Sequence, residues 1–146
     1  MFITRLIFGK FVGGRGAIAL LILRVVAGLA FVLHGWPKIK EPFNWMGPDA
    51  EIPGIMLALA AVAEFVGGLA WIVGALTPLF SFGILCTMAV AVHHHAVLQG
   101  DPFVGRNGSY ELALVYLCVA ILFLLMGPGK LSADAFIFRN SKSGKT

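Results

Sequence analysis

Residues 17–34 read AIALLILRVVAGLAFVLH, an apolar run that a single arginine interrupts. An α-helix needs about 20 such residues to cross the hydrocarbon core of a bilayer. Three more apolar runs follow, at residues 55–76, 78–98 and 110–126. Each run is continuous, whereas the strands of a membrane β-barrel alternate apolar and polar residues. The sequence therefore predicts an all-α integral membrane protein, a four-helix bundle with antiparallel up-down topology.

The composition of the 146 residues supports this class and excludes others. Hydrophobic residues make up 59% of the chain and charged residues only 12%, about half the charge of a typical soluble domain. The chain has no phosphate-binding glycine loop, no dinucleotide fingerprint and no ligand set for haem or an iron–sulfur cluster. We expect no nucleotide, haem or iron–sulfur cofactor. The net charge of +4 reflects membrane topology, and no nucleic-acid partner is expected.

Basic residues are distributed unevenly over the segments that flank the apolar runs. Seven lie before the first run or after the fourth, and three lie in the two longer loops: Arg5, Lys10, Arg15, Lys130, Arg139, Lys142 and Lys145 against Lys38, Lys40 and Arg106. Cytoplasmic segments are enriched in Lys and Arg, so both termini are predicted to be cytoplasmic. We therefore divide the chain into a cytoplasmic N-terminal segment (1–16), a membrane domain (17–138) and a cytoplasmic tail (139–146).

Charged residues within apolar runs are costly, so each marks a candidate centre that needs a partner. Arg24, Glu64 and Glu111 are of this kind. The first helix is predicted to end at His34 and Pro37. On that basis Arg24 and Glu64 both lie about 15 Å below the same membrane surface, on adjacent antiparallel helices. We therefore expect an Arg24–Glu64 ion pair, which either joins two helices or has a working role.

Several histidines lie toward the same outer side as Glu111, Lys38 and Arg106. They are His34 and the consecutive residues His93, His94 and His95. Successive residues on a helix are about 100° apart, so the three histidines cannot share one metal ion, and we expect His93 to face the interior. Residues of these types bind polar head groups, relay protons or hold a metal ion, and the set here is His34, Glu64, His93 and Glu111. No metal ligand is predicted.

The two cysteines, Cys86 and Cys118, lie among small apolar residues and are predicted to be buried packing residues.

Short motifs in a fixed order resemble the DoxX family of small bacterial and archaeal membrane proteins. They are Arg24 with Gly28, His34-Gly35, Ala63-Glu64-Phe65 before Gly67-Gly68, Leu76-Thr77-Pro78, Tyr110-Glu111 and residues 127–134, GPGKLSAD. The resemblance covers residues 17–138. It implies a multi-pass protein of the bacterial or archaeal inner membrane, related to the quinone-reducing membrane subunit of thiosulfate:quinone oxidoreductase.

This resemblance implies a redox-associated subunit with a pocket for ubiquinone, menaquinone or another small molecule in its outer half. Glu64, His34 and His93 are the expected catalytic residues, and the expected binding residues are Arg24, Lys38, Glu111, Tyr110 and Arg106. The expected partners are the lipid bilayer, an oxidoreductase that donates electrons and a second copy of the chain. Two alternatives remain open, a non-catalytic scaffold for an oxidoreductase and a small-molecule or proton pathway.

Overall fold

The computed structural model describes residues 11–48, 50 and 52–140, and within them it contains only helices, turns and loops. The elements are α2 (Arg15–Lys40), α3 (Gly54–Val73), α4 (Thr77–His93), the π-helical segment η1 (His94–Leu98), α5 (Glu111–Met126) and α6 (Ala133–Asn140). The expectation of an all-helical chain is confirmed, and each predicted apolar run forms a helix.

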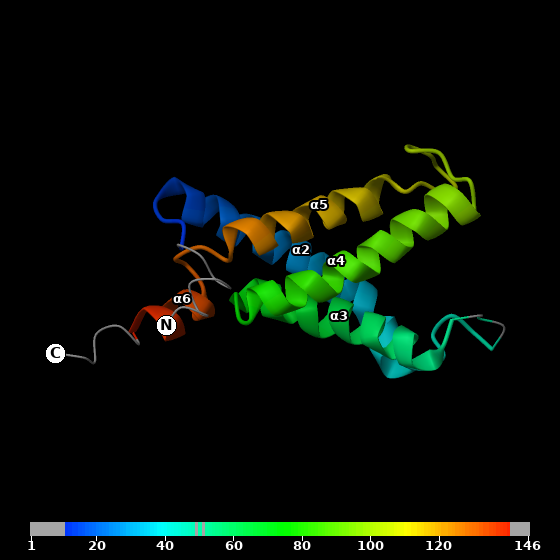
Figure 1. The fold of residues 1–146 in the computed structure, drawn as a ribbon, viewed down its shortest axis with the longest axis horizontal. Coiled ribbons are helices and arrows are strands. Elements are labelled where there is room, and N and C mark those ends of the chain that lie inside the picture. Colours follow the sequence, from blue (N-terminus) through cyan, green and yellow to red (C-terminus); the bar gives the residue numbers. More distant parts are fainter. Residues whose placement is uncertain (1–10, 49, 51, 141–146) are drawn as a thin grey trace.

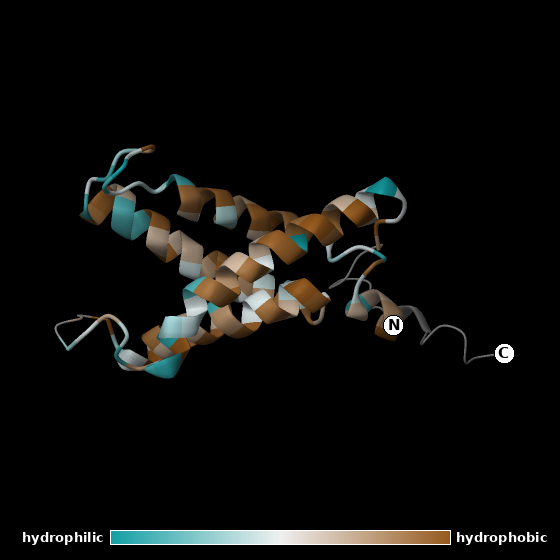
Figure 2. Ribbon diagram, turned by 180° about the vertical axis from the view of Figure 1, so that it is seen from behind, coloured by the Kyte–Doolittle hydropathy of each residue, from teal (hydrophilic) through white to brown (hydrophobic). Residues whose placement is uncertain are grey.

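Three of these helices are long and apolar enough to cross a membrane: α2, α3 and the continuous stretch Thr77–Leu98. Helix α5 is equally apolar but has 16 residues, fewer than the roughly 20 of a typical span. Large apolar side chains are exposed along all four helices, for example Ile22, Leu59, Leu79 and Leu125 (Figure 2). Water-soluble monomers rarely expose so much apolar surface, so this surface is the one that faces lipid.

The helices pack in the order α2, α3, α4 and α5, each against the next (Figure 1). The start of α2 and helix α6 lie at one end of the molecule, here named the terminal end. The α2–α3 and η1–α5 connections lie at the opposite end, the loop end. Toward the loop end, the α2–α3 pair and the α4–α5 pair diverge from one another, and the candidate site lies between them.

Helices α2 and α3 touch through their backbones. A Cβ atom at Gly28 would lie 2.6 Å from the carbonyl oxygen of Gly68, and one at Gly35 would lie 2.5 Å from the amide nitrogen of Phe65. Only glycine permits such an approach, which is typical of helix contacts in membranes. Because the backbones are in contact at both Gly28 and Gly35, the position of α2 along the axis of α3 is fixed.

Helix α2 is longer than the sequence analysis predicted. Pro37 lies inside the helix, which ends only at Lys40, so the expectation that Pro37 marks its end is wrong. Proline removes one backbone donor, and this loss is tolerated near a helix end. The extra turn moves Lys38 onto the helix and places Arg24 nearer the terminal end than expected.

At the terminal end, the buried side chain of Arg24 binds backbone carbonyls. Its Nη1 donates to the carbonyl oxygen of Trp71 at 3.4 Å and its Nη2 to that of Leu131. The buried carboxylate of Asp134 accepts the amides of Leu76 (2.7 Å) and Thr77 (2.9 Å) at the start of α4. These contacts connect the segment after α5 to α2, α3 and α4.

Two predicted features of the chain path are confirmed. The α3–α4 connection is short, because α3 ends at Val73 and α4 begins at Thr77. Helix α5 ends at Met126, directly before Gly127, whose φ of 68° is easily adopted by glycine.

The prediction that the two cysteines are buried is wrong. Cys86 and Cys118 are both free and exposed on the helix surface. A Cys side chain is small and apolar enough for a lipid-facing position, so the local sequence did not distinguish the two environments.

Replacing Asp134 by Ala should destabilise the fold by about 3 kcal/mol, because the amides of Leu76 and Thr77 and the nearby Arg24 lose their buried carboxylate partner. Thermal unfolding in detergent, followed by circular dichroism, measures this. The control is Leu131→Ala, which keeps the carbonyl that Arg24 binds and truncates a half-exposed side chain. Equal stability of the two variants would contradict this role of Asp134.

Substituting Gly28 by Ala should cost about 1–3 kcal/mol, because the new methyl group forces α2 away from the backbone of Gly68. Gly83→Ala is the matched control, since a Cβ there meets only the side chain of Ala63 at 3.3 Å. Denaturant titration of both variants in the same detergent measures the difference. A Gly28 variant as stable as the Gly83 variant would show that the close contact is not required.

Candidate functional site

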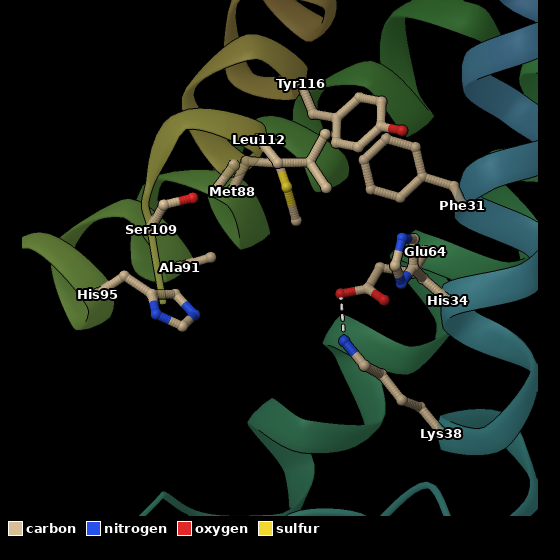
Figure 3. A pocket seen from close by; sticks show the side chains of 11 residues that line it. Phe31, His34, Lys38, Glu64, Met88, Ala91, His95, Ser109, Leu112 and Tyr116 are labelled. Carbon is tan, nitrogen blue, oxygen red and sulfur yellow. Dashed lines mark hydrogen bonds and ion pairs between the residues drawn. The ribbon is translucent and has the colours of Figure 1, made fainter. Parts of the chain in front are cut away.

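A cavity of about 250 Å³ lies in the loop-end half of the molecule, between the two diverging helix pairs (Figure 3). Its walls come from α2, α3, α4, η1 and α5, together with Ser109, which precedes α5. The lining residues are Phe31, His34, Lys38, Glu64, Met88, Ala91, His95, Ser109, Leu112, Ala113 and Tyr116. The cavity is slightly smaller than the roughly 300–1,000 Å³ of pockets for drug-sized ligands, so it suits a single ring.

An ion pair between Lys38 and Glu64 forms one side of the cavity. Lys38 Nζ donates to Glu64 Oε1 at 2.7 Å, and the side chain of Glu64 is only 3% exposed. The same ammonium group lies 4.4 Å from the centre of the Trp45 ring, a cation–π contact. Within the described residues, the second carboxylate oxygen of Glu64, Oε2, is buried without a hydrogen-bond partner.

Apolar side chains form the wall next to this ion pair. The rings of Phe31 and Tyr116 lie 4.8 Å apart between centroids, and Met88 and Leu112 lie beside them in the close-up view. Figure 3 also shows His34 next to Glu64. The cavity therefore combines a few polar groups with an apolar lining, which is the usual composition of a site for a small organic ligand.

His95 reaches the cavity from the opposite side (Figure 3). Its Nδ1 donates to Asp101 Oδ2 at 2.7 Å. Among the described residues, Asp101 is the only hydrogen-bond partner of the His95 ring. An ionised carboxylate can only accept hydrogen bonds, so Asp101 fixes the proton on Nδ1 and leaves Nε2 available.

His95 lines the cavity because it lies seven residues after Met88 and four after Ala91, on the same face of the helix. The π-helical segment η1 begins only at His94. The amide of Gln99 donates to the carbonyl oxygen of His94 five residues earlier, so the turn holds one more residue than an α-helical turn. His93 is exposed and lies outside the cavity lining. The prediction that His93 faces the interior is therefore wrong, because His93 lies seven residues after Cys86, on a helix face that is exposed.

The predicted Arg24–Glu64 ion pair is also wrong. Gly35 packs on Phe65, the neighbour of Glu64, and Arg24 lies 11 residues before Gly35, about 16 Å along the helix. Arg24 instead binds the carbonyls at the terminal end, and Glu64 is paired with Lys38. The error arose because ending the first helix at His34 placed Arg24 too close to the loop end.

The other predicted binding residues divide into two groups. Lys38 lines the cavity together with His34 and Glu64. Glu111 and Arg106 are exposed and are not part of its lining. Tyr110 also lies outside the lining, with its ring 5.4 Å from that of Phe103. Glu111 is thus a charge in the first turn of α5, a position that the helix dipole favours.

Sequence reasoning missed Tyr116, Ser109, His95 and the Lys38–Glu64 pairing. One signal for the pairing was available, because His34 and Lys38 are four residues apart and therefore share a helix face. A signal for His95 was also available, because Met88, Ala91 and His95 have the i, i+3, i+7 spacing of one helix face. Within the described part of the chain, no three His, Cys, Asp or Glu residues are grouped so as to hold a metal ion.

The apolar helices and the buried charges between them define this chain as a small polytopic membrane protein whose helices enclose charged side chains. The sequence model of the DoxX family matches residues 19–96, just over half of the chain. The chain belongs to the DoxX family. The matched region includes all of the cavity residues from α2, α3, α4 and η1.

Curated relatives extend over most of the chain. A Haemophilus influenzae protein is 32% identical over 122 residues, 82% of this chain and 91% of its own length. The Bacillus subtilis protein named "Putative oxidoreductase CatD" is 29% identical, with 87% and 92% covered. The Escherichia coli "Inner membrane protein YphA" is 31% identical, with 84% and 92% covered. No solved structure gives a significant match.

Lys38→Met should destabilise the protein by about 3 kcal/mol, because it leaves the Glu64 charge buried without a partner. The double variant Lys38→Met/Glu64→Gln should recover most of this loss, since it removes the unpaired charge as well. Unfolding of the wild type, both single variants and the double variant completes a double-mutant cycle. Additive effects in that cycle would mean that the two side chains do not interact.

Proposed function

We propose that this DoxX-family protein binds the ring of a quinone, of the ubiquinone or menaquinone type, in the loop-end cavity. In this proposal it is the membrane subunit of a redox system, and a partner oxidoreductase supplies the electrons. The observation that carries the proposal is the buried Glu64 carboxylate. One of its oxygens is paired with Lys38 and the other has no partner among the described residues, beside an apolar and aromatic wall.

The residues present fit such a ring. A quinone has a flat apolar body with oxygen atoms at its edge, and the cavity offers aromatic surface from Phe31 and Tyr116 beside the charged pair. The Lys38 ammonium group has three N–H donors, so it can donate to a ligand oxygen while it remains bonded to Glu64. Glu64 Oε2 can accept a hydrogen bond from the hydroxyl group of the reduced form.

A bound quinone would supply two-electron, two-proton redox chemistry, which the protein side chains do not provide themselves. The contribution of the chain is to bind and orient the ring and to exclude water from it. Neither haem nor iron–sulfur ligands are expected from the sequence, so the electrons come from a partner in this proposal. The name of the Bacillus subtilis relative, which contains the word oxidoreductase, supports a redox role.

The proposal includes a membrane topology. Helix α5 crosses the bilayer as a fourth span and completes an up-down bundle, with its short length extended by flanking residues. The terminal end faces the cytoplasm, in line with the Lys and Arg bias, and the cavity opens on the other side. The inner membrane is the proposed location, since two Escherichia coli relatives carry the name "Inner membrane protein".

A non-catalytic scaffold is the second candidate function. Large aromatic side chains are exposed at the loop end, where Trp36, Phe43 and Phe103 are each more than half exposed. Aromatic residues of this kind are enriched at protein interfaces. Copurification of the same oxidoreductase by the wild type and by a cavity variant, without any effect of quinone, would favour the scaffold.

A pathway for small molecules or protons through the membrane is the least supported function. Between the cavity and Arg24, the backbones of α2 and α3 are in contact at Gly28 and Gly68. This close packing weighs against a polar route along that helix pair.

A quinone-binding experiment tests the proposal directly. Decylubiquinol, the reduced form of decylubiquinone, at about 100 times its dissociation constant should stabilise the purified wild-type protein by about 2.7 kcal/mol under anaerobic conditions. Glu64→Gln should lose most of this thermal shift, because it replaces the carboxylate that accepts the quinol hydroxyl group by a neutral amide, a weaker acceptor. Glu111→Gln is the matched control and should keep the shift, since Glu111 is exposed outside the cavity.

Quenching of tryptophan fluorescence by the quinone gives a second measurement that does not depend on unfolding. The ring of Trp45 lies over Lys38, so a ligand at Lys38 should quench it. Absence of both signals in the wild type would reject the proposal, and so would an undiminished shift in Glu64→Gln.

A further inference from the structure

The polar groups of the cavity lie on two opposite sides of its apolar lining. Lys38, Glu64 and His34 come from α2 and α3, whereas His95 and Ser109 come from η1 and the residues before α5. Figure 3 shows the two groups facing one another across the cavity, with Phe31, Met88 and Tyr116 along one wall. A ligand that satisfies both sides therefore spans the two diverging helix pairs.

His95 is held in place for such a contact. Its Nδ1 is bonded to Asp101 at 2.7 Å, and the ring of His94 packs edge-on against it with centroids 5.5 Å apart. His94 itself is engaged elsewhere, with its Nε2 3.1 Å from Gln99 Nε2. The π-helical turn and the Asp101 carboxylate thus fix both the position of the His95 ring and the identity of its free nitrogen.

We propose that His95 binds a second oxygen of the ligand, at the ring position opposite the oxygen bound by Lys38 and Glu64, and that Asp101 is its positioning residue. This inference rests on the proposed function and adds to it the residue that binds the second of the two para oxygens of the ring. A hydroxyl group at one end accepts from Lys38 Nζ and donates to Glu64 Oε2. The hydroxyl group at the other end donates to His95 Nε2.

A pair of ligands that differ by one hydroxyl group separates this role from general binding. The probes are tetramethylhydroquinone and 2,3,5,6-tetramethylphenol, measured by isothermal calorimetry under anaerobic conditions. The wild type should bind the hydroquinone about 2- to 12-fold more tightly, the range that one net hydrogen bond contributes. In His95→Phe this ratio should fall to about 1, whereas the affinity for the phenol should remain close to that of the wild type.

His93→Phe is the matched control, because His93 is a nearby histidine that is exposed and does not line the cavity. It should keep the wild-type ratio. Asp101→Ala should lower the ratio, since the His95 ring then loses the partner that orients it. A wild-type ratio in Asp101→Ala would overturn the positioning role of Asp101.

The outcomes distinguish this inference from the proposed function. If neither ring binds to the wild type, the proposed function fails. If both rings bind equally well, or if the ratio persists in His95→Phe, the cavity binds a ring but His95 does not contact its second oxygen, and the inference is overturned.

Discussion

The backbone contact between α2 and α3 is the constraint on which both polar regions of the protein depend. Glycines at positions 28, 35 and 68 bring the two helices so close that no Cβ atom fits between them. The displacement of one helix along the other is therefore fixed. At this register Lys38 lies beside Glu64 at the loop end, and Arg24 lies beside the last turn of α3 at the terminal end.

The two ends use their buried charges differently. At the terminal end, Arg24 and Asp134 bind backbone groups of several segments, so these charges hold the helices and the chain after α5 together. At the loop end, the helix pairs diverge, and the Lys38–Glu64 pair faces a cavity. A buried carboxylate oxygen without a partner is costly unless a ligand satisfies it. Arg24 Nε and Thr77 Oγ1 at the terminal end are also buried without a partner among the described residues. Of these three residues only Glu64 lines the cavity, and this is why we propose binding at the loop end.

The sequence predicted the helices well, because long apolar runs have few alternatives in a bilayer. It also predicted the short α3–α4 connection and placed His34, Lys38 and Glu64 among the site residues. It failed in two places. Pro37 lies within a helix that continues to Lys40, and this displaced Arg24. The face that carries Cys86 and His93 is exposed, whereas the face that carries Met88 and His95 lines the cavity. The surface position of Cys86 and Cys118 could not be predicted either, since lipid and protein interior are equally apolar.

The central claim is that a ring binds between the two helix pairs, beside Glu64. Photolabelling with an azido-substituted quinone, followed by peptide mass spectrometry, tests it most directly. The account predicts labels on cavity residues from both pairs, such as Phe31 on α2 and Met88 or Tyr116 on α4 and α5, and suppression of these labels by excess unmodified quinone. Labels confined to lipid-facing residues such as Val90 and Leu125, with no suppression, would contradict it.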